Sequence, residues 1–170
     1  MNYSKPILFI CAIALFNLAI AQTEPTRSQK LRGSITPERE WWDLVHYDLA
    51  MQIFPEEKSI KGTNTISFKS LSPGQRLQID LQEPLKITWV KMEEQELRFT
   101  REGNVYYISL PKQIQAGANA KITIAYQGQP LVSKNPPWSG GISWQKDKNG
   151  DHFIATACQG IGASVWWPCK

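Results

Sequence analysis

The stretch that decides the fold is "LVHYDLAMQIF", residues 44–54. Its apolar positions are Val45, Tyr47, Leu49, Met51 and Ile53, and the positions between them are His46, Asp48, Ala50 and Gln52. Alternation with a period of two places these two sets on opposite faces of an extended chain. The stretch therefore predicts a half-buried β-strand.

The same period recurs along most of the chain. In-phase sets are Asn64, Ile66 and Phe68; Leu77, Ile79 and Leu81; Leu85, Ile87 and Trp89; Leu97 and Phe99; and Ile122, Ile124 and Tyr126. Val90 and Met92 fall in the opposite phase, which predicts a bulge or a strand buried on both faces. Turn residues separate the sets, and no stretch of ten residues has a helical apolar period. The pattern predicts an all-β fold, an antiparallel β-sandwich.

The first 21 residues have the features of a signal peptide. Lys5 precedes an apolar run from Ile7 to Ile20, and Ala19-Ile20-Ala21 has small residues at the cleavage spacing. The alternative is a retained membrane anchor, but the run is shorter than the span of about 20 apolar residues that a bilayer requires. We therefore expect cleavage and export to the periplasm or the extracellular space, with no membrane attachment afterwards.

The rest of the chain divides into a leader and one domain. Residues 22–40 are polar and predict a flexible leader, and residues 41–170 predict the β domain. Between residues 129 and 141 proline and glycine are too frequent for a regular strand. Asn149-Gly150 then predicts a hairpin with a type I′ turn.

Charge and motifs exclude several functions. The 19 basic residues less Lys5 leave 18 against 15 acidic residues, a surplus too small to favour nucleic-acid binding. His46 and His152 belong to no metal-binding spacing, and the chain has no His-Glu-x-x-His. Asp147 and Asp151 lack the remaining ligands of a calcium loop. We therefore expect no catalytic residues, metal or cofactor in this chain.

Two features of the last third leave alternatives open. Cys158 and Cys169 either form a disulfide in an oxidising compartment or remain buried thiols. Four tryptophans lie here, Trp138, Trp144, Trp166 and Trp167. They either wedge the sandwich against its loops or another domain, or present flat rings to a carbohydrate.

Several ordered motifs resemble a known family. They are "HYDLAMQIFPEEKSIKGTNTISF", "LQIDL", "ITIAYQGQP", "WSGGISW" and "TACQGIGASVWWPCK". Together, from about Trp42 to Lys170, they are similar to the N-terminal β domain of the aminopeptidase N family of zinc metallopeptidases. The resemblance implies a sandwich that packs on a separate catalytic domain, which holds zinc through His-Glu-x-x-His and a distant glutamate. None of those motifs occurs in this chain, so zinc is expected only in a full-length enzyme.

The resemblance transfers one site residue. Gln159 matches the position at which the family sends a glutamine toward the amine and first residue of a peptide substrate. Many relatives have a second polar residue where this chain has Ala157. The resemblance also implies that the catalytic domain packs on the tryptophan-rich run that ends at Lys170.

Two hypotheses for the function follow. The first is the non-catalytic, substrate-contacting domain of an exported zinc aminopeptidase, incomplete at its C-terminal end and inactive in isolation. The alternative is a stand-alone secreted β-sandwich that binds glycans through its tryptophans.

Overall fold

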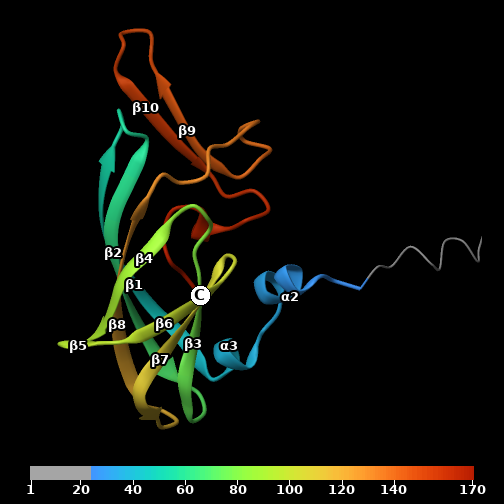
Figure 1. Cartoon of the computed structure of the whole chain (residues 1–170), viewed down its shortest axis with the longest axis vertical. Helices are drawn as coiled ribbons and strands as arrows, with labels where there is room; N and C mark the ends of the chain where they lie inside the picture. Colours follow the sequence, from blue (N-terminus) through green and yellow to red (C-terminus); the bar gives the residue numbers. More distant parts are fainter. Residues whose placement is uncertain (1–23) are drawn as a thin grey trace, which may run out of the picture.

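The computed structural model describes residues 24–170. The predicted signal peptide, residues 1–21, lies outside this range. Two antiparallel sheets face each other, and a β-hairpin extends from one end of the pair (Figure 1). This confirms the predicted all-β fold. Within the described range no helix has the length and apolar character needed to cross a membrane.

The larger sheet has five strands in the order β1-β2-β8-β4-β5. Their bounds are β1 Trp42–Phe54, β2 Ser59–Ser70, β8 Asn119–Gly128, β4 Lys86–Met92 and β5 Gln95–Glu96. Each strand is antiparallel to its neighbour. The sheet is a scaffold long enough to extend beyond the smaller sheet at its upper end (Figure 1).

The smaller sheet has three strands in the order β3-β7-β6, with bounds β3 Gly74–Asp80, β7 Val105–Ile114 and β6 Arg98–Glu102. The hairpin consists of β9 Gly141–Lys146 and β10 His152–Ala157. A short 3-10 helix, η1 Ala163–Val165, follows the hairpin.

The core lies between the two sheets and is formed by the in-phase residues of the sequence. Ile66 and Phe68 of β2, Leu77 and Ile79 of β3, and Ile122 and Ile124 of β8 all have no more than 1% exposure. The period-two pattern predicts these faces correctly because successive side chains of a strand point to opposite sides. Of the two alternatives for β4, a bulge or a strand buried on both faces, the structure shows the bulge, since the register of β4 against β8 shifts between Ile87 and Trp89.

Strand β1 departs from its predicted burial. Tyr47 and Met51 pack against the core, but Val45 is 64% exposed and Leu49 and Ile53 are also exposed. Two structural features account for this. A register shift between Leu44 and His46 displaces Val45 from the alternation. In addition, β1 is an edge strand with a single neighbour, so its apolar face is only partly covered.

The predicted flexible leader is corrected by the structure for residues 27–40. Two short helices occupy it, α2 Arg27–Gly33 and α3 Pro37–Glu40. Thr26 and Gln29 form a capping box at the start of α2. Leu31 packs with Val105 and Tyr107 of β7 in a small apolar cluster. The helices escape a periodicity search because each is short and α2 buries a single side chain.

The hairpin between β9 and β10 is confirmed, but its predicted turn is wrong. A type I′ turn needs two residues at positive φ, and only Gly150, at φ 89°, has one here. The Asp147 carboxylate accepts hydrogen bonds from the backbone N–H groups of Asn149 and Asp151 instead. This side chain stabilises a longer loop, which a dipeptide signal does not encode.

Candidate functional site

The candidate site begins at the loop that follows β10. The Cys158 carbonyl accepts hydrogen bonds from the backbone N–H groups of Ile161, at 3.3 Å, and Gly162, at 2.9 Å. Gly160 and Gly162 have φ values of 74° and 72°, a conformation that side chains with a Cβ rarely adopt. The loop is therefore a compact turn with a defined backbone course.

A second segment supports this turn from behind. A Cβ atom placed on Gly140 would lie 2.4 Å from Cγ1 of Ile161 and 2.7 Å from the Gln159 carbonyl oxygen. Only glycine permits so close an approach. The structure thus brings together the "WSGGISW" and "TACQGIG" motifs.

Gln159 lies at the exposed part of this turn. Within residues 24–170 its side-chain amide makes no hydrogen bond. Its amide oxygen and NH2 group are therefore free to accept and donate. Ala157 pairs with Gly141 at the end of the hairpin and offers no polar group.

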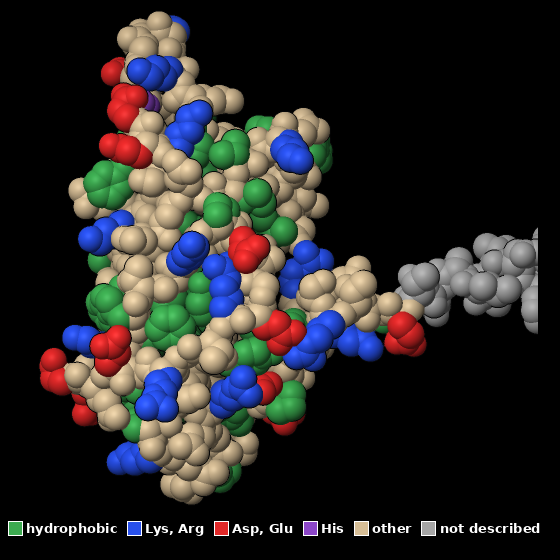
Figure 2. Space-filling view, in the orientation of Figure 1, with side chains coloured by type: hydrophobic (Ala, Val, Ile, Leu, Met, Phe, Trp, Pro, Cys, Tyr) green, Lys and Arg blue, Asp and Glu red, His purple; other side chains and the backbone are tan. Residues whose placement is uncertain are grey.

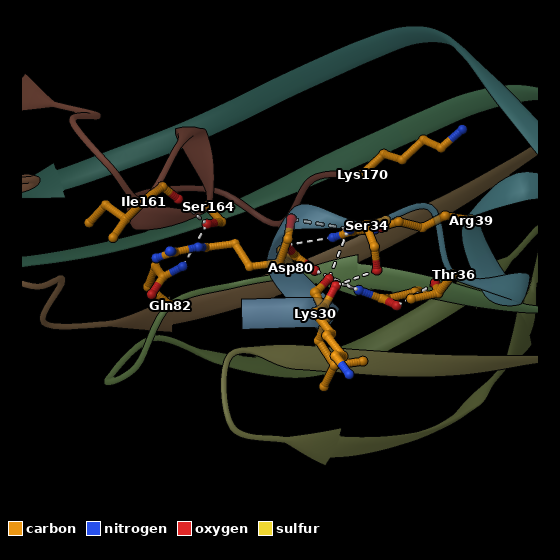
Figure 3. A network of polar contacts seen from close by, with 12 residues as sticks. Lys30, Ser34, Thr36, Arg39, Asp80, Gln82, Ile161, Ser164 and Lys170 are labelled. Carbon is orange, nitrogen blue, oxygen red and sulfur yellow. Dashed lines mark hydrogen bonds and ion pairs between the residues drawn. The ribbon is translucent and has the colours of Figure 1, made fainter. Parts of the chain in front are cut away.

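The chain that follows the turn is hydrogen-bonded to the end of β3 and to the residues just after it. The backbone of Cys169 pairs with that of Asp80 through two hydrogen bonds, with N···O distances of 2.7 and 3.0 Å. The backbone N–H of Gln82 donates to the Ser164 carbonyl at 2.8 Å, and its side-chain amide donates to Ser164 Oγ at 2.9 Å. Figure 3 shows the contact between Gln82 and Ser164 and the adjoining Ser164–Ile161 bond. They connect the loop of Gln159 to the sandwich.

The end of the run crosses the sheet of β1 and β2. Asn64 Nδ2 donates to the Pro168 carbonyl at 2.8 Å, and the Lys170 backbone N–H donates to Tyr47 Oη at 2.7 Å. The Lys170 ammonium also bonds the Trp42 carbonyl and lies 4.5 Å from the centroid of the Trp42 ring. Burial raises the pKa of Tyr47 to about 12, so its hydroxyl remains protonated at neutral pH.

A buried ion pair joins β3 to the N-terminal helices. Arg39 Nη2 lies 2.6 Å from Asp80 Oδ2, and Arg39 Nη1 donates to the Leu31 carbonyl at 2.9 Å. Gln78 Nε2 donates to the same carbonyl and to Asp80 Oδ1. Burial raises the pKa of the Asp80 carboxyl above its ordinary value, while Arg39 opposes this shift. Sequence reasoning missed this network, because the partners are about forty residues apart.

The four tryptophans occupy two different environments. Trp144, Trp166 and Trp167 are half-buried against the core, whereas Trp138 is 76% exposed. The rings of Trp166 and Trp167 meet edge to face, with planes at 69°. Buried, mutually inclined rings do not form a flat platform for a sugar.

The two cysteines of the domain are free thiols. Cys158 is exposed, beside Gln159, and Cys169 is buried. Burial raises the pKa of Cys169 to about 12, which keeps its thiol neutral. Of the two thiols, only that of Cys169 is buried, as one alternative expected for both.

The histidines are both at the surface of the molecule. His46 is exposed on β1, and His152 Nε2 lies 3.0 Å from Glu56 Oε1, a contact that places the hairpin beside the turn between β1 and β2. Among residues 24–170 no group of three or more His, Cys, Asp or Glu side chains is placed to hold a metal ion. Basic and acidic side chains are interspersed on the face seen in Figure 2.

A family model and solved structures match this chain. The model of the Peptidase M1 N-terminal domain matches residues 44–170. No curated protein matches the chain in sequence. An M1 zinc metallopeptidase from Deinococcus radiodurans, a mutant form, has 22% identity and a TM-score of 0.61 over 78% of this chain and 29% of that one.

Two further structures of M1 zinc metallopeptidases from that organism are also similar to this chain. A mutant form bound to a Tyr-Ser-Ala substrate has 22% identity and a TM-score of 0.61, over 78% of this chain and 30% of that one. A structure without a stated mutation has 21% identity and a TM-score of 0.56 over the same shares. The chain thus spans less than a third of these proteins.

The family model covers nearly all of the sandwich, the hairpin and the C-terminal run. The resemblance to aminopeptidase N-like enzymes is confirmed, and the chain belongs to the M1 peptidase family as an N-terminal domain of that family.

Proposed function

We propose that this chain is the substrate-contacting domain of an exported zinc aminopeptidase, with Gln159 as its contact to the peptide. The free amide of Gln159 is the observation that supports this assignment. Its turn is closed by the Cys158 carbonyl and backed by Gly140, so the amide is presented from a fixed backbone.

The chemistry of an amide suits the amino end of a peptide. The Gln159 carbonyl oxygen would accept a hydrogen bond from the substrate ammonium, and its NH2 group would donate to a substrate carbonyl. Because the amide is neutral, it binds both groups without a change of protonation. Ala157 leaves this chain with one such contact.

Zinc does not fit the residues of this chain. Among the described residues no suitable ligand group exists, and the sequence has no His-Glu-x-x-His. In a complete enzyme zinc would polarise the scissile carbonyl and activate water. This chain contributes binding and orientation of the peptide, and no proton transfer is assigned to its residues.

The catalytic domain is the proposed partner of the C-terminal run. The run holds Gln159 in place through Ser164 and Cys169, so a domain that packs on the run would also be aligned with Gln159. Trp166 and Trp167 are half-covered by the sandwich itself, and only their remaining surface is available to a partner. The same burial disfavours the alternative of a stand-alone module that binds glycans through these rings.

A pair of substitutions in the complete enzyme tests the proposal. Gln159→Ala should raise KM for aminoacyl-nitroanilides about tenfold with a smaller change in kcat, because one good hydrogen bond to a charged group contributes about 1.5 kcal/mol or more. Gln145→Ala on β9, also an exposed glutamine, is the matched control.

The isolated 170-residue chain is the second control. It should release no product and retain no stoichiometric zinc, because it lacks a ligand set. Unchanged kcat/KM in Gln159→Ala would remove this residue from the site. Turnover by the isolated chain would refute the assignment of catalysis to another domain.

A further inference from the structure

The outer face of the five-stranded sheet carries a shallow trough, and Gln159 is not among the residues that line it. One cross-strand row has small side chains on three adjacent strands, Ala50 of β1, Thr63 of β2 and Ala125 of β8. Trp89 of β4 is paired with Ala125 and ends the row. Small residues beside one large aromatic residue produce a depression with a ring at one end.

Longer side chains border this trough on one side, in the row Gln52, Lys61, Gln127 and Lys86. The row on the other side is Asp48, Thr65, Thr123 and Lys91, in which the longest side chain is Lys91, next to Trp89. The resulting depression has a volume of about 520 Å³, lined among others by Gln52, Thr63, Thr88, Trp89 and Gln127. This is large enough for a small ligand.

The bulge in β4 positions the aromatic ring. The register shift between Ile87 and Trp89 places Thr88 and Trp89 together on the outer face, while Ile87 and Val90 remain in the core. Trp89 is half-buried, and Ala125 is only 7% exposed. The Lys91 ammonium lies 5.4 Å from the centroid of the Trp89 ring and restrains it further.

The charge of this face is predominantly positive. Its outward lysines, by strand register, are Lys61, Lys69, Lys86, Lys91 and Lys121. The acidic side chains at the same register positions are Asp43, which is paired with Lys69, and Asp48 and Glu96, at the two ends of one row, so lysines outnumber acidic residues by five to three. Lys61 and Lys86 flank Gln127 with no acidic residue in their row, so this side of the trough is complementary to an anion.

We propose that the trough binds an acidic oligosaccharide, a function separate from the peptidase reaction. A pyranose ring would pack on Trp89, whose flat face suits the apolar side of a sugar. The amides of Gln52 and Gln127 would hydrogen-bond its hydroxyl groups, and Lys61 and Lys86 would bind its carboxylates. A single aromatic ring among amides favours a sugar over single-stranded nucleic acid, which proteins bind with several successive aromatic rings.

Titration of the full 170-residue chain with alginate hexamer, an oligomer of uronic acids, tests the proposal. We expect binding by isothermal titration calorimetry that weakens as salt is added. Trp89→Ala should weaken it about tenfold, the loss of an interaction of roughly 1.4 kcal/mol. Ala50→Phe should do the same by filling the trough while every charge is kept. Trp138→Ala, which removes an exposed tryptophan outside the trough, should bind alginate as the parent does.

A second pair of variants tests the contribution of the charged side chains to binding. Lys61→Gln should weaken binding severalfold and reduce its salt dependence, and Lys134→Gln, on an exposed loop, should do neither. Circular dichroism and urea unfolding establish that each variant is folded.

Three results would overturn the proposal. They are absence of alginate binding at millimolar concentration, equal binding by Ala50→Phe and the parent, and equal affinity for poly-glutamate or for a single-stranded oligonucleotide. Cellohexaose, which is neutral, should bind at least tenfold more weakly. None of these results bears on Gln159, so the two proposals fail independently.

Discussion

Arg39 connects the N-terminal helices to the sandwich through its contact with Asp80 (Figure 3). Its guanidinium pairs with Asp80 and donates to the carbonyls of Leu31, Arg32 and Ser34. Both partners of the pair are at least nine-tenths removed from solvent as whole residues. A buried pair of this kind contributes little relative to an apolar pair, but the loss of one partner is costly.

We therefore predict that Arg39→Ala destabilises the domain by about 3–5 kcal/mol, because the Asp80 carboxylate is left buried and unpaired. Urea unfolding followed by tryptophan fluorescence measures the change. Arg98→Ala, at an exposed position of β6, should remain within about 0.5 kcal/mol of the parent. Equal stability of the two variants would show that the ion pair has no structural role.

The elements around the site depend on close backbone contact. The turn at residues 158–162 and the segment before β9 approach each other at Gly140, and the C-terminal run continues from the turn to β3. Backbone contact of this kind defines the position of Gln159 more narrowly than side-chain packing would, because backbone atoms have few alternative conformations.

Gly140→Ala should destabilise the domain by about 1–3 kcal/mol, because the added methyl group overlaps Ile161 and the Gln159 carbonyl. In the complete enzyme it should also raise KM by displacing the Gln159 turn. Gly33→Ala is the matched control, since no atom lies within 4 Å of the added Cβ and alanine favours a helix. If Gly140→Ala unfolds at the same urea concentration as Gly33→Ala, the contact between residue 140 and the Gln159 turn does not require glycine.

At the scale of the whole molecule, β3 is the centre of the assembly. Its apolar face packs in the core, while Gln78 and Asp80 hold the N-terminal helices and Asp80 and Gln82 hold the C-terminal run. The domain therefore binds both of its terminal segments through β3 and Gln82, which lies two residues past the end of that strand. A partner domain that contacts the run would meet a surface already fastened to the sandwich.

Export is a prediction for the whole molecule, and it rests on residues 1–21. Expression of the full chain with its native start in a Gram-negative host should yield a periplasmic product that begins at Gln22, because the apolar run is too short to remain as an anchor. Intact mass and cell fractionation measure this. Replacement of two apolar residues of the run by lysine should retain the uncleaved chain in the cytoplasm. An uncleaved product in the periplasm or membrane would contradict the prediction.

The sequence by itself determined the fold class, most strand faces and the change of phase in β4, because alternation along a strand is a local consequence of backbone geometry. It also determined the family, through motifs that run from β1 to Lys170. The sequence did not predict the exposure of Leu49 and Ile53, because burial depends on which neighbouring element covers a strand. The tertiary structure alone decided that Arg39 meets Asp80, that Gly140 supports Gln159 and that Trp89 closes a row of small residues. These contacts join residues distant in the chain, and only the topology of the two sheets brings them together.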